Sequence, residues 1–144
     1  MTLDEIFEQW GIDAHVDRLN LGDASLDSAK LHHKYYRMLS NERLRLKKME
    51  ADFAELMQDK KAWCSGELTS EELKSRGWNQ QLKKMLKSEV DEFLKADKDV
   101  IAFTLKMAMQ KEKTEVLDSI IKTIANRSFH INNAISWEKF KAGM

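Results

Sequence analysis

The fold is decided by one uninterrupted stretch that contains neither proline nor glycine. It covers residues 26–64 and reads LDSAKLHHKYYRMLSNERLRLKKMEADFAELMQDKKAWC. Proline removes a backbone donor and glycine is costly inside a helix, so their absence permits an unbroken helix. Ser65-Gly66 follows directly, and a glycine just past the last turn is typical of a left-handed helix stop. The stretch therefore predicts one long helix over 26–64, capped by Ser25 or Asp27.

This helix carries two different stripes. At 100° per residue, its apolar side chains fall within an arc about 100° wide, and a set of basic side chains falls within a second arc centred roughly 110° away. The apolar stripe consists of Leu31, Tyr35, Met38, Leu39, Leu46, Met49, Phe53 and Leu56. The cationic stripe consists of Lys30, Lys34, Arg37, Arg45 and Lys48.

The remaining sequence predicts shorter helices, so the expected fold class is all-α: a long amphipathic helix plus shorter helices. These helices are expected over 3–10, from Thr69 to Gly77, and over 80–95, 98–126 and 131–141. Asp97 is expected to cap the helix over 98–126. Its middle, residues 110–115, is entirely polar and predicts a bend or a solvated turn.

The length of the central helix favours an oligomer. At 1.5 Å per residue it would span about 58 Å, whereas a compact domain of this size is roughly 40 Å across. The apolar stripe would then need cover from other subunits. The alternative is a shorter or bent helix in a monomer.

Charge is balanced in total but strongly patterned. The chain has 24 basic and 24 acidic residues. In residues 1–29 seven acids against one base leave −6, and in residues 30–48 seven bases against one acid leave +6. A neutral total therefore does not argue against a polyanionic partner. A solvated helix face is the alternative explanation of the basic zone.

Two further basic groups lie beyond this zone. Lys60 and Lys61 stand beside Trp63 at the end of the long helix, where the helix dipole by itself favours cations. The second group surrounds Trp78 and is as easily a solvated surface as a nucleic-acid path. Its members are Lys74, Arg76, Lys83, Lys84 and Lys87.

Several function classes find no support in the sequence. There is no phosphate-cradling glycine loop and no nucleophile elbow, so no enzyme is expected. The single cysteine, Cys64, excludes an internal disulfide, and adjacent His32 and His33 point apart on a helix, so neither a metal site nor a cofactor is expected. No apolar run is long enough for a membrane span, and the N-terminus does not look like a secretory signal. A reducing compartment, the cytoplasm, fits best.

Three segments in one register resemble the phage recombination mediator family UvsY of T-even-type phages. The first is Glu50-Ala51 with Lys60 through Gly66, which is similar to the family's basic helix running into an aromatic-aromatic-Ser-Gly stop. The others are Ala96-Asp97-Lys98-Asp99-Val100 and the tail Phe140-Lys141-Ala142-Gly143. The similarity runs from about residue 30 to the end, and the first 29 residues match poorly.

The resemblance implies a specific function. Members of the family bind single-stranded DNA, form ring-like homo-oligomers of six or seven subunits, and act without nucleotide hydrolysis. They help a RecA-like phage recombinase to replace the phage single-strand-binding protein, in the host cell cytoplasm. The family's DNA-contacting Lys and Arg fall on Gln58, a departure, and on Lys60, a match. The family's aromatic pair falls on Trp63 and Cys64, so one aromatic remains.

The hypothesis is thus a recombination mediator in which 1–29 is an acidic N-terminal segment, 30–95 a helical DNA-binding region and 96–144 a helical oligomerisation region, within one compact domain. Assembly is assigned to Leu117, Ile120, Ile121 and Ile124. The alternative is a helical oligomeric scaffold or protein-interaction module without nucleic-acid binding. The residues assigned to DNA binding are Lys60, Lys61, Trp63, Lys34, Arg37, Arg45, Lys47 and Lys48.

Overall fold

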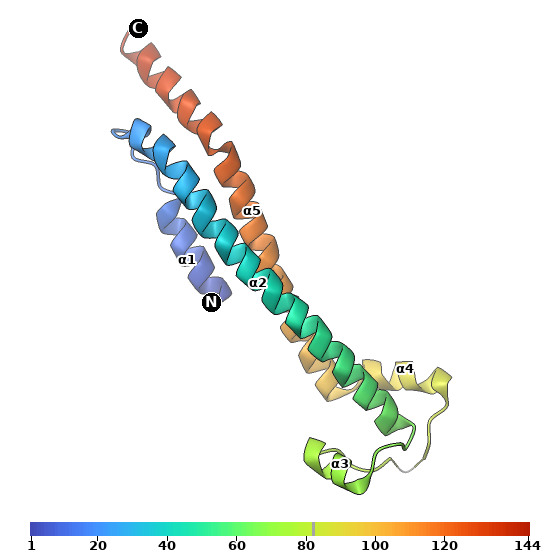
Figure 1. Cartoon of the computed structure of the whole chain (residues 1–144). Helices are drawn as coiled ribbons and strands as arrows, with labels where there is room; N and C mark the ends of the chain where they lie inside the picture. The colour runs from blue at the N-terminus through green and yellow to red at the C-terminus, as the bar shows by residue number, and fades with distance from the viewer. Residues whose placement is uncertain (82) are drawn as a thin grey trace. The chain divides into compact units, whose positions relative to one another are not determined.

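The computed structural model describes residues 1–81 and 83–144, and this part of the chain contains five α-helices and no strand (Figure 1). The predicted all-α class is confirmed. The predicted stop after the long helix is confirmed as well, because Gly66 has φ of 72°, in the left-handed region that glycine adopts without steric cost. The helices are α1 (Leu3–Asp13), α2 (Leu21–Cys64), α3 (Ser70–Arg76), α4 (Lys87–Lys95) and α5 (Lys98–Lys141).

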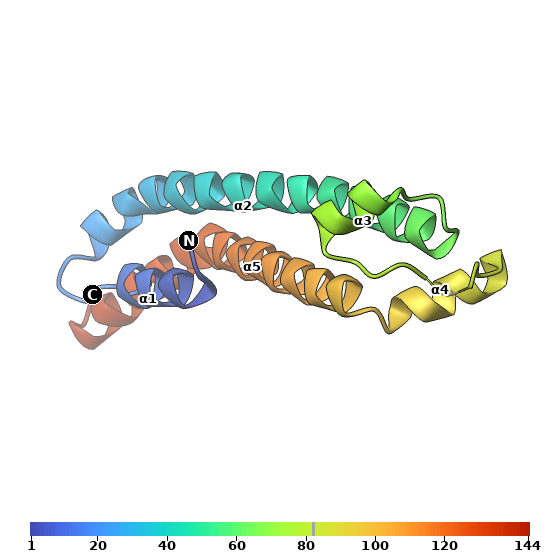
Figure 2. The same ribbon diagram turned by 90° about the horizontal axis from the view of Figure 1, so that it is seen from below.

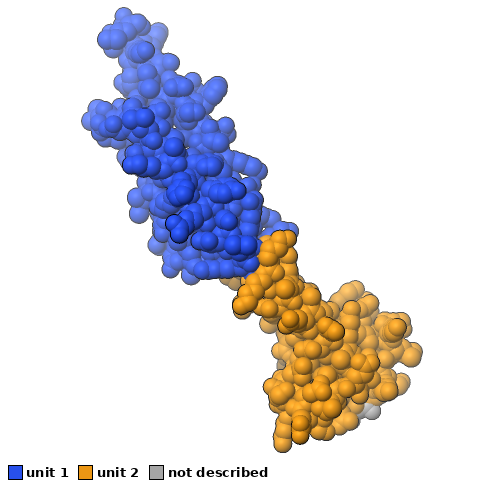
Figure 3. Space-filling view, in the orientation of Figure 1, with its two compact units in different colours: residues 1–45, 110–144 blue, residues 46–109 orange. Residues whose placement is uncertain are grey.

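The chain divides into two compact units, and both long helices contribute to each (Figure 3). Unit 1 comprises residues 1–45 and 110–144, and unit 2 comprises residues 46–109. Unit 1 therefore holds α1, the first part of α2 and the last part of α5. Unit 2 holds the rest of α2 and α5 together with the short helices α3 and α4.

Three helices pack around one core in unit 1, where α2 and α5 run side by side (Figures 1 and 2). Trp10 of α1 meets Tyr35 of α2 edge to face, with ring centroids 5.4 Å apart. Burial of aliphatic and aromatic side chains is the main force that holds such helices together. The core consists of Ile6, Tyr35, Leu39, Leu117, Ile120 and Ile124.

The prediction that the C-terminal apolar positions face a neighbouring subunit is wrong. Leu117, Ile120 and Ile124 are buried in the core of unit 1, and Ile121 packs against it. The stripe of α2 that was expected to need cover from other subunits is covered in unit 1 by its own chain, so the oligomer stays a prediction without this support. In unit 1 α5 covers Tyr35 and Leu39, so their cover comes from the same chain.

A buried polar contact replaces the bend that the sequence predicted in the middle of α5. Gln110 is buried, and its Nε2 donates to the carbonyl of Glu42 at 2.9 Å and to the Glu42 carboxylate at 2.6 Å. Buried polar groups are nearly always hydrogen-bonded, and here α2 supplies the partners. The polar run is therefore helical, with Gln110 facing α2, and α5 continues through it.

Two predicted C-terminal helices are one continuous helix, α5. The interruption expected between 126 and 131 is absent because Arg127 and Ile131 are both buried and extend the inward face set by Ile124. Their spacing of four and three residues keeps them on one side of a helix. No glycine or proline lies between them to stop it.

α2 begins five residues earlier than predicted, at Leu21. Ser25 and Asp27 therefore lie inside the helix and are not its caps. The Asp17 carboxylate accepts from the N–H of Leu19 at 3.0 Å and from the Asn20 amide at 2.7 Å, which forms the turn before the helix. Gly22 lies in the first turn of α2.

Unit 2 has a smaller core around the C-terminal end of α2. Cys64, Val90 and Leu94 are buried together, and Phe53 of α2 lies against Phe103 of α5 with centroids 5.6 Å apart. α4 begins at Lys87, later than the predicted residue 80, because the Glu89 carboxylate accepts from the N–H of Leu86 at the helix start. Leu82, which belonged to the predicted helix, lies outside the described residues.

Asp97 starts α5 as the sequence predicted. Its carboxylate accepts from the N–H groups of Asp99 and Val100, both at 3.1 Å. These donors would otherwise lack a partner in the first turn of a helix. Thr69 caps α3 in the same way, by accepting from the N–H of Glu72 at 3.2 Å.

Candidate nucleic-acid interface

The C-terminal end of α2 brings together two segments of unit 2 that are separated in sequence. Beyond Gly66 the chain returns, and the N–H of Met85 donates to the carbonyl of Cys64 at 3.2 Å. Lys84 then lies so close to Gly66 that a Cβ at the glycine would meet two of its side-chain carbons at 3.5 Å. The helix stop and the segment before α4 therefore form one surface.

Four lysines gather on this surface, and we call them the lysine cluster: Lys61, Lys83, Lys84 and Lys87. Lys61 and Lys87 line one hollow of about 320 Å³ together with Ser65. Lys83 and Lys84 line a second hollow of about 580 Å³ that also exposes Phe93.

All four lysines are exposed, and none forms an ion pair with any described residue. Two acidic residues also line the hollows. Asp91 lines the first and Glu89 the second, although a carboxylate oxygen of Glu89 already accepts from Leu86. Exposed ammonium groups without internal partners remain free to neutralise phosphates.

Lys60 occupies a different environment from its neighbour Lys61. Its side chain is 1% exposed, and its Nζ lies 3.1 Å from the Asp97 carboxylate and 2.8 Å from that of Asp99. The same ammonium stands over two indole rings, 4.5 Å from the centroid of Trp63 and 4.1 Å from that of Trp78. The ion pairs and the cation–π contacts tie the end of α2 to the start of α5.

Trp63, the aromatic residue among those assigned to DNA binding, has an internal role in this structure. Its indole N–H donates to the carbonyl of Asn79 at 2.7 Å. Its ring lies 5.4 Å from that of Trp78 and 5.9 Å from that of Phe93, between centroids. Phe93 is the more exposed of these aromatics and borders the lysine cluster, so it is better placed than Trp63 to meet a base.

The other predicted contacts divide into paired and unpaired cations. Lys34 pairs with Asp13 at 2.6 Å and Arg45 with Glu42 at 3.1 Å, both in unit 1. Lys47 pairs with Glu50 at 3.9 Å in unit 2 and is largely exposed. A solvent-exposed pair such as Lys47–Glu50 is weak, so Lys47 can exchange Glu50 for a phosphate partner. Arg37 and Lys48 are exposed and have no ion pair with any residue in 1–81 or 83–144.

Sequence reasoning named Lys83, Lys84 and Lys87 without placing them in the site. The sequence signal was the number of basic residues close to Trp78. A high number of basic residues does not by itself distinguish a nucleic-acid-binding surface from an ordinary solvated one. What joins them to Lys61 is the backbone hydrogen bond from Met85 to Cys64 and the contact of Lys84 with Gly66. Both are tertiary contacts.

The ion pair between Lys60 and Asp99 should make the free energy of unfolding depend on pH in the acid range. The hydrogen bond from Lys60 lowers the pKa of the Asp99 carboxyl below its ordinary value of 3.8. An acid whose pKa is lowered by folding stabilises the fold above that value and loses the effect as pH falls through its folded pKa. Asp99→Asn should therefore reduce the free energy of unfolding at neutral pH, and the difference from the unmodified chain should shrink below about pH 4. Urea unfolding over a pH series measures this, and a difference independent of pH would contradict it.

The fold and the site define a class of protein: an all-α chain built on two long helices, with unpaired cations suited to a polyanion. Within residues 1–81 and 83–144 no cluster of three metal-ligating side chains occurs, and no helix has the length and apolarity to cross a membrane. The chain belongs to the UvsY family, because the family model described as "Recombination, repair and ssDNA binding protein UvsY" matches residues 9–144.

Crystal structures of the bacteriophage T4 recombination mediator protein UvsY share this fold. In lattice type II the TM-score is 0.83 at 20% identity, covering 99% of this chain and 98% of the other. Lattice type IV gives 0.81 at 18%, covering 98% and 99%, and lattice type I gives 0.82 at 19%, covering 95% and 98%. Identities this low show a common fold and not common contacts. Among curated proteins none matches the chain.

Proposed function

We propose that this protein is a recombination mediator that binds single-stranded DNA through exposed cations, chiefly those of the lysine cluster. Membership of a family described as recombination, repair and single-stranded-DNA-binding supports the class of function. The single observation that carries the site is that Lys61, Lys83, Lys84 and Lys87 gather on one surface without carboxylate partners among the described residues. Arg37, Lys48 and the weakly paired Lys47 would add further phosphate contacts.

The proposal extends to what the bound strand is for. The protein would promote loading of a RecA-like recombinase in place of a single-strand-binding protein, without catalysis of its own, in the host cell cytoplasm. A homo-oligomer of six or seven subunits would repeat the lysine cluster around one particle. Weak sites repeated in this way act together through effective concentration and bind a strand tightly.

Salt dependence tests the electrostatic basis of binding. Four lysines on four phosphates should give a log–log slope of affinity against salt of about −3, since each phosphate contact contributes about −0.7 with a single strand. Fluorescence anisotropy with labelled oligo-dT over a salt series measures the slope. Lys61→Gln combined with Lys87→Gln should make the slope shallower by about 1.4. An affinity that does not change with salt would contradict the proposal.

Loading of the recombinase needs its own measurement. A RecA-like recombinase assayed for filament formation on DNA coated with single-strand-binding protein should show a shorter lag when this protein is added. The Lys61→Gln, Lys87→Gln variant is the matched control, because it should fold normally and restore the lag. If the protein oligomerises but binds no oligo-dT at low salt, the scaffold alternative is favoured, with pairs such as Lys34–Asp13 showing how the basic zone would be used.

A further inference from the structure

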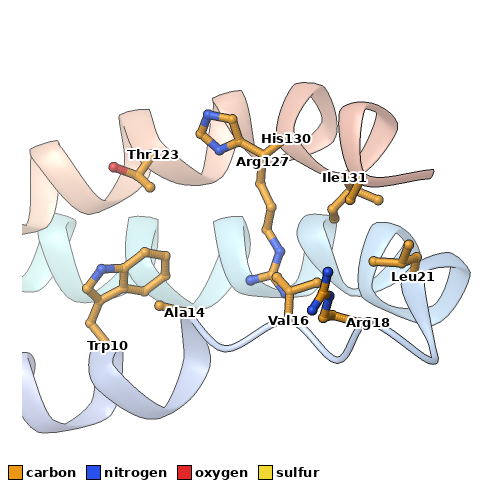
Figure 4. A pocket seen from close by; sticks show the side chains of 10 residues that line it. Trp10, Ala14, Val16, Arg18, Leu21, Thr123, Arg127, His130 and Ile131 are labelled. Carbon is orange, nitrogen blue, oxygen red and sulfur yellow. The ribbon is translucent and has the colours of Figure 1, made fainter. Parts of the chain in front are cut away.

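An apolar pocket of about 280 Å³ opens in unit 1 between α1, the segment that follows it, and α5 (Figure 4). Its walls include Trp10, Val16, Leu21 and Ile131. This volume lies near the lower end of the roughly 300 to 1,000 Å³ typical of ligand sites. The pocket therefore suits one bulky apolar side chain better than a whole cofactor, and none of its lining residues belongs to the lysine cluster.

Basic side chains border this apolar pocket: Arg18, Arg127 and the imidazole of His130. Figure 4 shows Arg127 reaching from α5 toward the segment that carries Val16, while Arg18 lies beside Leu21. The pocket thus combines apolar walls with a concentration of nitrogen donors.

Arg127 is the unusual member of this group. Its side chain is 7% exposed, its Nη1 donates to the backbone carbonyl of Asp13 at 3.0 Å, and its Nε has no hydrogen-bond partner. No carboxylate of the described residues lies within ion-pair distance of its guanidinium. Arginine is almost never fully buried unless it is paired, because an uncompensated buried charge is costly.

The chain's own acids do not supply the missing anion. The Asp13 Oδ2 accepts from Lys34 at 2.6 Å and from the Tyr35 hydroxyl at 2.8 Å, so Lys34 already compensates the charge of this carboxylate, which forms no ion pair with Arg127 among the described residues. Glu138 reaches Arg18 only at 3.8 Å, and the Arg18 side chain is largely exposed while that of Glu138 is about half exposed. The excess of positive charge beside the pocket is therefore complementary to an incoming carboxylate.

We propose that this pocket docks a short acidic segment of a partner protein, in which one bulky apolar side chain enters between Trp10 and Ile131 and flanking carboxylates meet Arg18 and Arg127. The site requires both the apolar side chain and the carboxylates of this segment. The apolar side chain gains from removal of its surface from water, and the carboxylates form charge-assisted hydrogen bonds with guanidinium groups. The site gives the protein a means of holding another protein that does not use its DNA-binding cations.

Fluorescence anisotropy with defined peptides tests this pairing. The probe is a labelled, capped hexapeptide with the sequence Asp-Asp-Leu-Phe-Asp-Asp, added to the full-length protein. One control replaces every Asp by Asn, and the other replaces Leu-Phe by Ser-Ser. The probe should bind at least about tenfold more tightly than either control, since hydrogen bonds to charged groups and apolar burial each contribute that much.

A matched pair of variants locates the binding. Ala134 lines the pocket, whereas Ala125 is exposed on the opposite side of the same helix and does not line it. Ala134→Leu should fill the pocket and weaken probe binding by at least about tenfold, and Ala125→Leu should leave it unchanged. Arg18→Gln, at a largely exposed position, should weaken binding without affecting the fold. Thermal unfolding of each variant verifies that it is folded.

Three outcomes would overturn the proposal. Equal binding of the Ser-Ser control would mean that the peptide is held by surface charge alone, and unchanged binding to Ala134→Leu would place it elsewhere. Tighter binding of a labelled peptide of residues 135–144 with a free carboxyl end would assign the pocket to a second copy of this chain. Oligo-dT titrations of the same variants should be unchanged, because none of the substituted residues belongs to the lysine cluster, so the DNA-binding proposal is tested separately.

Discussion

Replacing Lys60 by methionine should lower the free energy of unfolding by about 3 kcal/mol, the lower end of the range for removing one partner of a buried ion pair. Loss of the Lys60 charge leaves two carboxylates without their partner. The carboxylate of Asp97 is nearly buried, but that of Asp99 is half exposed and stays solvated, so the lower end of the range applies. Methionine keeps the length of the side chain, so the loss reports the missing charge. Urea unfolding followed by circular dichroism measures it.

Lys61→Met is the matched control, since it is the same change at the next position of α2. Lys61 is exposed and has no ion pair among the described residues, so its loss should change stability by less than about 0.5 kcal/mol. It should instead weaken binding of oligo-dT and make the salt slope shallower by about 0.7. The two adjacent lysines are thus expected to separate folding from binding. A Lys60→Met protein of normal stability that fails to bind DNA would contradict this division.

Truncating Leu117 to alanine should cost about 3 kcal/mol, because Leu117 is 0% exposed and the surrounding core of unit 1 can collapse only partly around the cavity. The loss should be the same at low and high protein concentration, since the partners of Leu117 are Tyr35, Leu39 and other residues of its own chain. Thermal unfolding at several concentrations measures both properties.

The matched control for this prediction is Leu105→Ala, which makes the same truncation at an exposed position of the same helix. It should change the free energy of unfolding by less than about 0.5 kcal/mol. If instead the effect of Leu117→Ala grew as the protein was diluted, the residue would act at a subunit interface, because only association makes stability depend on concentration.

Lys60 has one role by the family register and another in the structure. By register Lys60 falls on a residue that contacts DNA in the family, and that assignment remains a prediction for this chain. In the present structure its ammonium is enclosed by Asp97, Asp99 and two indole rings. The exposed cations of the lysine cluster are groups that a phosphate could reach without breaking a buried pair.

Local patterns were sufficient to predict the fold class and the ends of several elements. The absence of proline and glycine from residues 26–64 predicted the long helix. Gly66, Asp97 and Thr69 lie at helix ends, as expected. These features depend on backbone conformation and on hydrogen bonds to near neighbours in sequence, so the residues themselves specify them. The division of the long helix into an apolar and a cationic stripe is of the same kind.

Other features depended on partners distant in sequence. The polar run around Gln110 reads as a solvated bend until Glu42 is placed opposite it, and the break expected near residue 128 disappears once Arg127 and Ile131 are buried. The sequence therefore determined the all-α class, the long central helix and where cations are dense. The tertiary structure alone decided which cations pair with buried carboxylates and which stay unpaired. For Lys60 that choice depends on the free energy of burying its charge beside Asp97 and Asp99, which lie 37 and 39 residues away in the chain.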